Sequence, residues 1–403
     1  MNSRDVVILG STGSIGTQAL ELIGRNRDRF RVLAISAGGD NVGLLAQQAL
    51  EFEVEVVAVA KATVVQDLQL AFYAEAQRKG YAQGEFRIPK IIAGPDAATE
   101  LAGLPCDVVL NGITGSVGLG PTLAALDAGN TLALANKESL VVGGPLVTKR
   151  VKPGQIVPVD SEHSAIAQCL RSGTGQEVRK LILTASGGPF RGRPRRELAR
   201  VTPAQALEHP NFAMGPVVTI NSATLVNKGL ELIEAHLLFG VPLNEVEVVV
   251  HPQQAVHSMV EFVDGSTIAQ IGIPTMTLPI ALGMSWPDRV PDAAMPWSWA
   301  EASTWEFLPL DNEAFPSVQL AREAGIRGGT APAVFNAANE ECVAAFRAGR
   351  LPFLAIVDTV ARVVTDHDVP SYVDLSIEDV LSAESWARTR ARQLIGVQET
   401  TQV

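Results

Sequence analysis

Cysteine, basic residues and long hydrophobic runs are all scarce in this sequence, and each scarcity excludes a class of protein. Only three cysteines occur among 403 residues and no CxxC pair is present, so a disulfide framework and a cysteine zinc site are excluded. Lysine and arginine number 32 against 43 acidic residues, and the formal net charge of −11 argues against nucleic acid as a partner. No apolar stretch of about 18 residues is present, so we expect no membrane span.

The remaining composition is that of a globular protein with more than one domain. Hydrophobic residues make up 47% of the chain and charged residues 19%, which allows sizeable cores, and 403 residues exceed the usual size of one domain. The first apolar run, at residues 6–9, is too short for a signal peptide. Together with the isolated cysteines, this predicts a cytoplasmic protein.

The first part of the chain alternates short β-branched runs with helical periodicity, which is typical of a parallel, doubly wound sheet. The predicted strands are residues 6–9, 31–36, 54–59, 90–93, 108–111 and 131–134. The predicted helices are residues 17–24, 42–50, 64–80, 96–102 and 120–129. We therefore predict a Rossmann-like dinucleotide-binding domain at residues 1–152.

The pattern changes after this domain. Residues 153–286 mix strands and helices, including a hairpin signalled by Asp264 and Gly265, and predict a central α+β catalytic domain with an open sheet. A linker rich in proline and tryptophan follows at residues 287–312. Helical periodicity dominates residues 313–403, which predicts a C-terminal α-helical domain.

A glycine-rich loop, GxxGxxG at residues 10–16, lies between the first predicted strand and helix. Glycines there let the backbone approach a pyrophosphate at the helix N-terminus, although a tight turn without a ligand is the alternative. The loop after the second strand, residues 36–41, contains no Lys or Arg, and Asp40 would repel a 2′-phosphate if it pointed inward. These residues alone leave NAD and NADP equally open.

Asp160 and Glu162 lie two positions apart after residues 155–159, which are predicted to be extended. Both carboxylates can then face one side of a strand end, where they suit Mg²⁺ or Mn²⁺ rather than Zn²⁺. His163 follows as either a supporting or an exposed side chain. The alternative, a solvated acidic turn without a metal, stays open at this point.

A second polar group is predicted on a helix at residues 222–238, with Ser222 as its N-cap and a strand before it at residues 217–220. Polar side chains share one face of this helix: Asn227, Lys228, Glu231 and Glu234. Either the helix is half buried over a cleft, or it is a surface helix whose Lys228–Glu231 pair contributes about 0.2–0.5 kcal/mol. Residues 186–188 predict a phosphate-binding turn and residues 209–215 a mobile lid.

Taken in order along the chain, these motifs resemble the 1-deoxy-D-xylulose 5-phosphate reductoisomerase family. The resemblance runs from Gly10 to roughly residue 395. It is carried by residues 10–16, 135–139, 158–163, 184–191, 209–215, 221–231 and 279–287. It implies NADPH-dependent rearrangement and reduction of 1-deoxy-D-xylulose 5-phosphate to 2-C-methyl-D-erythritol 4-phosphate, in the non-mevalonate isoprenoid pathway. It also implies a homodimer.

The resemblance further implies a role for each matching residue. One divalent ion (Mn²⁺, Mg²⁺ or Co²⁺) would be held by Asp160, Glu162 and Glu231. The phosphorylated sugar would contact Ser161, Glu162, Ser186, His209, Ser222, Asn227, Lys228 and Glu231. NADPH would contact Gly10, Thr12, Gly13, Ser14, Ile15, Gly39, Asn41, Asn136, Lys137, Glu138 and Gly215. The catalytic residues would be Lys137, Glu162, His209 and Glu231.

The chain departs from the family pattern at two positions. Phe212 stands in the lid where the family usually has Trp, which keeps aromatic packing but removes an N–H donor. Asp40 stands where the family often has Lys or another polar residue near the 2′-phosphate. NADPH preference therefore rests on the resemblance rather than on this loop.

Two other functions compete with this interpretation. A reductase of the aspartate-semialdehyde type needs a thiolate nucleophile, for which Cys106 and Cys169 lack basic surroundings. A non-catalytic NADP-binding protein would be expected to have lost part of the metal or phosphate set, and here every member is present.

Overall fold

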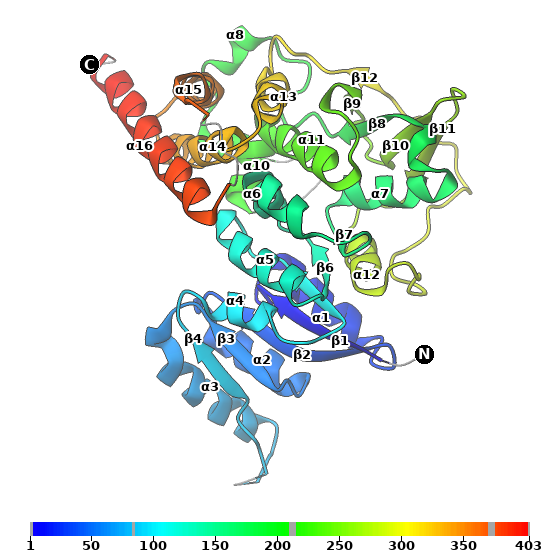
Figure 1. Cartoon of the computed structure of the whole chain (residues 1–403), viewed down its shortest axis with the longest axis vertical. Helices are drawn as coiled ribbons and strands as arrows, with labels where there is room; N and C mark the ends of the chain where they lie inside the picture. The colour runs from blue at the N-terminus through cyan, green and yellow to red at the C-terminus, as the bar shows by residue number, and fades with distance from the viewer. Residues whose placement is uncertain (1–2, 83–84, 209–214, 370–374, 402–403) are drawn as a thin grey trace. The chain divides into compact units, whose positions relative to one another are not determined.

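The computed structural model describes residues 3–82, 85–208, 215–369 and 375–401. The chain divides into two compact units, each formed from separate stretches of sequence (Figure 1). The first unit comprises Met1–Ser139, Lys149–Ser164 and Thr275–Met295. The second comprises Leu140–Thr148, Ala165–Pro274 and Pro296–Val403. Helices α6 (Lys137–Arg150) and α7 (Ser161–Cys169) each contain residues of both units.

A seven-stranded parallel sheet forms the centre of the first unit, in the order β4-β3-β2-β1-β5-β6-β7. Its strands are β1 (Arg4–Leu9), β2 (Phe30–Ala37), β3 (Val56–Val59), β4 (Lys90–Ala93), β5 (Val108–Asn111), β6 (Thr131–Leu134) and β7 (Ile156–Pro158). The order reverses between β1 and β5, which is where open α/β sheets bind their ligands. The predicted Rossmann-like sheet is confirmed.

Helices cover this sheet, and its central strands are mainly apolar because both faces of the sheet are buried. Val6, Val7, Ile8 and Leu9 are all fully buried. The helices are α1 (Ser14–Gly24), α2 (Val42–Glu51), α3 (Val65–Arg78), α4 (Ala97–Ala102), α5 (Leu119–Asp127) and α12 (Thr277–Ser285), with short 3₁₀ turns η1 (Ala62–Val64) and η2 (Ser116–Gly118). Although α12 is remote in sequence, it packs against α1 and β6.

The second unit contains a five-stranded mixed sheet, in the order β11-β10-β8-β9-β12. Its strands are β8 (Val178–Ala185), β9 (Val246–Val250), β10 (Val256–Phe262), β11 (Thr267–Ile271) and β12 (Leu308–Pro309). Strands β10 and β11 form the predicted hairpin, in which Asp264 Oδ1 accepts from the Ser266 N–H at 2.9 Å and Gly265 has a φ of 88°. The open sheet predicted for this region is confirmed, and its strand pairing is mixed.

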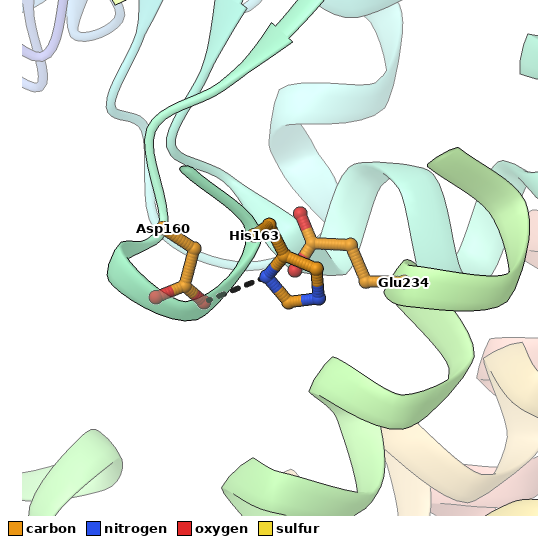
Figure 2. A group of neighbouring side chains, drawn as sticks. All are labelled: Asp160, His163 and Glu234. Carbon is orange, nitrogen blue, oxygen red and sulfur yellow. Dashed lines mark ion pairs between the residues drawn. The ribbon is translucent and has the colours of Figure 1, made fainter. Parts of the chain in front are cut away.

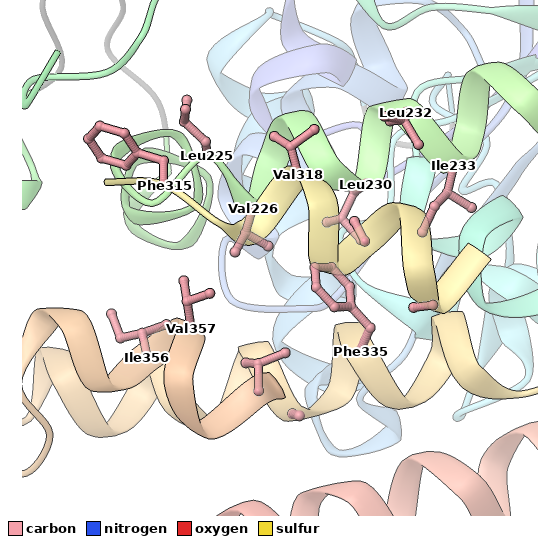
Figure 3. Packing of buried hydrophobic residues seen from close by; sticks show 14 of the residues in the cluster. Leu225, Val226, Leu230, Leu232, Ile233, Phe315, Val318, Phe335, Ile356 and Val357 are labelled. Atoms are coloured by element: carbon pink, nitrogen blue, oxygen red, sulfur yellow. The ribbon is translucent and has the colours of Figure 1, made fainter. Parts of the chain in front are cut away.

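Helices make up the rest of the second unit. They are α8 (Arg195–Leu198), α9 (Pro203–Ala206), α10 (Pro216–Ala223), α11 (Val226–Phe239), α13 (Ser317–Arg327), α14 (Ala331–Arg347), α15 (Phe353–Asp366) and α16 (Ile377–Thr401), with 3₁₀ turns η3 (Leu170–Ser172), η4 (Gly175–Glu177) and η5 (Leu243–Glu245). The apolar face of α11 contributes Leu230 to a core that also holds Val318 of α13 and Phe335 of α14 (Figure 3). The predicted helical C-terminal region is confirmed.

The segment before α11 differs from the prediction. Residues 217–220, predicted as a strand, lie in α10, and Ser222 lies inside that helix rather than at an N-cap. Pro216 occupies the first turn of α10, a position that proline favours, and burial of Ile220 outweighs the strand propensity of the β-branched run. Leu225, with a left-handed φ of 58°, separates α10 from α11.

None of the helices in the described ranges combines the length and the apolar character needed to cross a membrane.

Candidate active site

The glycine loop follows β1, at the point where the strand order reverses. Gly10 has a φ of 82°, and a Cβ at Gly16 would overlap the Gly10 carbonyl oxygen and Ser11 Cα, so both positions require glycine. Gly13 caps α1 without a side chain, so no capping group occupies the amides of its first turn. This is the backbone geometry that receives a pyrophosphate, with Thr12, Ser14 and Ile15 in the same loop.

The loop after β2 carries the residues expected near the adenosine ribose. Gly39 has a φ of 106°, and Asn41 Oδ1 accepts from the Leu44 N–H at 3.1 Å, so Asn41 caps α2. Asp40 forms an ion pair with Lys61, which follows β3. Lys61 was missed by the sequence reasoning, which looked for a cation only within the loop. The parallel neighbour strand was the available signal, because its carboxyl end shares the same edge of the sheet.

Asn136 fixes the loop at the carboxyl end of β5 to the start of α6. Its Nδ2 donates to the carbonyl oxygens of Ile113 and Gly115, and its Oδ1 accepts from the Ser139 N–H at 2.7 Å. Through these hydrogen bonds, the side chain of Asn136 fixes the conformation of the loop. Lys137 and Glu138 follow in the first turn of α6.

The acidic motif lies between β7 and α7. Asp160 follows the strand, and its Oδ1 accepts from the Ser161 N–H at 2.9 Å. Glu162 was predicted to lie at an extended strand end, but it lies in the first turn of α7. Its Oε2 accepts a hydrogen bond from Ser161 Oγ at 2.5 Å. Two carboxylates before and within the first turn of a helix are favoured by its dipole, which the strand interpretation did not consider.

Burial excludes the solvated acidic turn. Glu162 and His163 are buried, and the Asp160 side chain is 13% exposed. Asp160 forms an ion pair with Lys137 and lies 3.9 Å from His163 Nδ1 (Figure 2). Of the two predicted positions for His163, supporting the acidic motif or exposed to solvent, the structure excludes the exposed one: His163 is buried beside Asp160.

The polar face of α11 is also buried. Lys228 and Glu231 are 5% and 1% exposed, and Glu234, drawn in Figure 2, is fully buried. Glu231 forms an ion pair with Lys228 and accepts a hydrogen bond from Asn227. The surface-helix alternative is therefore wrong. A lysine buried near the positive end of a helix dipole is costly, which is typical of a residue retained for function.

The turn after β8 lies against α10. Gly187 and Gly188 have φ of 81° and 66°, and a Cβ at Gly188 would come within 2.8 Å of the Ser222 carbonyl oxygen. Ser186 Oγ accepts from the Gly188 N–H at 3.1 Å, and Arg191 Nη1 donates to the Ser186 carbonyl oxygen at 2.7 Å. The structure thus brings the turn that carries Ser186 beside Ser222. Sequence reasoning did not foresee that Arg191 holds this turn.

Two predicted residues of the lid, His209 and Phe212, lie outside the described residues. Gly215, predicted to contact the cofactor, is the N-cap of α10, and its carbonyl oxygen accepts from the Thr219 N–H at 3.0 Å.

Cys106 and Cys169 do not provide a thiolate nucleophile. Burial raises the pKa of Cys106 to about 12 and that of Cys169 to about 11. Both thiols are therefore protonated near neutral pH, which removes the basis for a reductase of the aspartate-semialdehyde type.

The strand order and the glycine loop define the first unit as a Rossmann-like, dinucleotide-binding protein module. Three family models match the chain: 1-deoxy-D-xylulose 5-phosphate reductoisomerase at residues 6–144, its C-terminal domain at residues 156–239, and the DXP reductoisomerase C-terminal domain at residues 271–390.

Relatives of the same name cover nearly the whole chain. The 1-deoxy-D-xylulose 5-phosphate reductoisomerase of Streptomyces coelicolor is 64% identical over 97% of this chain and 92% of its own. That of Kitasatospora griseola is 65% identical over 96% and 99%. The chain belongs to the 1-deoxy-D-xylulose 5-phosphate reductoisomerase family.

Solved structures of this family have the same fold. The Zymomonas mobilis reductoisomerase in complex with NADPH is 41% identical, with a TM-score of 0.88 over 98% of this chain and 99% of that one. A DOX-P reductoisomerase in complex with NADPH, fosmidomycin and magnesium is 34% identical, with a TM-score of 0.88 over 98% and 99%.

Proposed function

We propose that this protein uses NADPH and a divalent metal ion to convert 1-deoxy-D-xylulose 5-phosphate to 2-C-methyl-D-erythritol 4-phosphate. The observation that carries the proposal is 64% identity, over 97% of the chain, to a relative that bears the name of this reductoisomerase. Buried carboxylate, amide and ammonium side chains support it, because such a reaction needs groups that can hold a metal ion and a phosphate.

Asp160, Glu162 and Glu231 are proposed to hold one divalent metal ion. All three offer carboxylate oxygens, they belong to a set of side chains suited to a metal, and they are partly or fully buried. An oxygen-only donor set fits Mg²⁺ or Mn²⁺ better than Zn²⁺. When bound, the ion would act as a Lewis acid toward the carbonyl and hydroxyl oxygens of the sugar.

The phosphate of the substrate is proposed to bind between the turn at Ser186 and the start of α11. Ser222, Asn227 and Lys228 bring hydroxyl, amide and ammonium groups suited to a phosphate. Lys228 and the N-terminus of α11 both attract a negative charge. Binding the phosphate away from the reacting carbons would orient the sugar. Ser161, beside two of the proposed metal ligands, would position its other end.

NADPH is proposed to bind along the carboxyl edge of the first sheet. The pyrophosphate would lie on residues 10–16, the adenosine ribose near Gly39 and Asn41, and the nicotinamide near the start of α6. Lys137 pairs there with Asp160, so this lysine would link the nicotinamide end to the metal site. Gly215 and His209 are proposed to belong to a lid that excludes water.

The test follows NADPH oxidation with 1-deoxy-D-xylulose 5-phosphate in the presence of Mn²⁺ or of excess chelator. We expect oxidation that requires both substrate and metal and that falls at least a hundredfold in Glu231→Gln, whose fold is checked by circular dichroism. The matched control is Glu247→Gln on β9, an exposed carboxylate that pairs with Lys180 at 3.0 Å and should leave the rate unchanged. No oxidation by folded, metal-loaded protein would refute the proposed reaction.

Three further statements stay predictions. The homodimer follows from the resemblance alone, and the cytoplasmic location from the sequence alone. The division at residues 1–152, 153–286, 287–312 and 313–403 is proposed as the functional one, beside the two compact units.

A further inference from the structure

The ion pair between Asp40 and Lys61 is a feature that the proposed reaction does not use. The two side chains are 84% and 53% exposed, and they come from successive loops of the first unit. An exposed pair of this kind contributes little to stability, so the fold does not depend on it. Its position suggests a role instead.

The pair lies at the carboxyl edge of the sheet, beside the loop that receives the adenosine ribose. Strands β2 and β3 run parallel, with Ala37 in register with Val59, so the loops that follow them leave the sheet side by side. The ribose of a dinucleotide binds at the end of β2 in this fold. Lys61, two residues beyond β3, is therefore next to the ribose position.

Packing holds the Lys61 stem against this loop. A Cβ at Gly39 would lie 3.3 Å from Lys61 Cβ and 3.0 Å from Val64 Cγ2, so the loop passes directly over both side chains. Asp40 then holds the ammonium group above the loop. The stem is anchored while the charged end stays accessible to a ligand.

The loop after β2 by itself favours neither NADH nor NADPH, and the nearby Lys61 supplies the cation that the loop lacks. A lone acid after β2 favours an unphosphorylated ribose, because it repels a 2′-phosphate. Here the neighbouring ammonium offsets the charge of Asp40, and an ammonium has three donors, so N–H groups remain for a phosphate beside the one directed at Asp40.

We propose that Lys61 binds the 2′-phosphate of NADPH and so selects NADPH over NADH. The inference rests on the proposed function only through the identity of the cofactor. Asp40 shares this ammonium group with the phosphate, and its negative charge opposes phosphate binding.

The test measures binding without turnover, by isothermal titration calorimetry with adenosine 2′,5′-bisphosphate and with adenosine 5′-monophosphate. Lys61→Ala is expected to weaken bisphosphate binding about 10- to 100-fold and to leave monophosphate binding unchanged. Lys61→Arg should retain the preference, and Asp40→Asn should strengthen bisphosphate binding. Lys79→Ala, which removes an exposed lysine just after α3, is the matched control and should bind as wild type does.

Steady-state kinetics provide the second readout. In Lys61→Ala the KM for NADPH should rise by the same factor, with kcat and the KM for NADH little changed. Wild-type affinity of Lys61→Ala for the bisphosphate would overturn the inference, as would a wild-type protein that binds both nucleotides equally. If the bisphosphate preference depends on Lys61 but the sugar is not turned over, the inference holds and the proposed reaction fails.

Discussion

At the scale of single residues, the most informative group is the buried network on α11. Lys228 forms an ion pair with Glu231, and Asn227 donates to the same carboxylate. The sequence showed only that the three residues share a helix face. Burial changes the energetic importance of these residues. Charged groups removed from water require partners, whereas the same residues on a surface helix interact weakly.

Replacing Lys228 by Met should therefore destabilise the protein. The change leaves Glu231 buried without its cation, and we expect the free energy of unfolding to fall by about 3–5 kcal/mol. Urea denaturation in the presence of chelator measures it. The matched substitution Lys180→Met removes partly exposed ion pairs with Glu247 and Glu261 and should cost under about 1 kcal/mol. Equal losses in the two variants would contradict the burial argument.

At the scale of elements, the turn from β1 into α1 shows how close approach dictates sequence. Gly16 lies in the first turn of α1, where the helix contacts the backbone of Gly10 and Ser11. Gly24, at the end of the same helix, has only an ordinary contact at 3.8 Å with the Phe52 ring. Of these two glycines, Gly16 is required by close approach and Gly24 is not.

Gly16→Ala should weaken NADPH binding by at least about tenfold and destabilise the protein by about 1–3 kcal/mol, because the added methyl group overlaps the loop backbone. Gly24→Ala should bind NADPH normally and be neutral or up to about 1 kcal/mol more stable, because alanine favours helix. NADPH fluorescence titration and thermal unfolding distinguish the two. Normal NADPH affinity in Gly16→Ala would show that the loop tolerates the overlap.

At the scale of the whole molecule, the proposed metal ligands come from distant parts of the sequence. Asp160 and Glu162 follow β7, and Glu231 lies on α11. Such a ligand set exists only in the folded chain, so the metal should bind the native state and not the unfolded one.

Mn²⁺ should therefore raise the melting temperature. At a concentration 100 times the dissociation constant, the added stability is about 2.7 kcal/mol. Asp160→Asn should abolish most of this increase, whereas Asp264→Asn, at an exposed hairpin turn, should preserve it. Differential scanning calorimetry with and without chelator provides the measurement. An undiminished increase in Asp160→Asn would remove this carboxylate from the proposed ligand set.

Most strands of the first unit were predictable because both their faces are buried, so their apolar runs are unambiguous. Residues 108–111 and 131–134 match β5 and β6 at both ends. Residues 217–220 show the limit of this reasoning: a β-branched run favours a strand by propensity, yet Pro216 and the packing of Ile220 make it helix. The motifs identified the family because their order along the chain is far more specific than any one of them.

The sequence by itself determined the doubly wound sheet, the family and the chemical types of the site residues, since these depend on local periodicity and motif order. Only the tertiary structure decided that the face of α11 is buried, that Glu162 lies in the first turn of a helix, that the turn at Ser186 lies against α10 and that Asp40 faces Lys61. Each of these depends on contacts between residues that are distant in the chain or on the burial that packing creates. Periodicity along a sequence carries no information about such contacts.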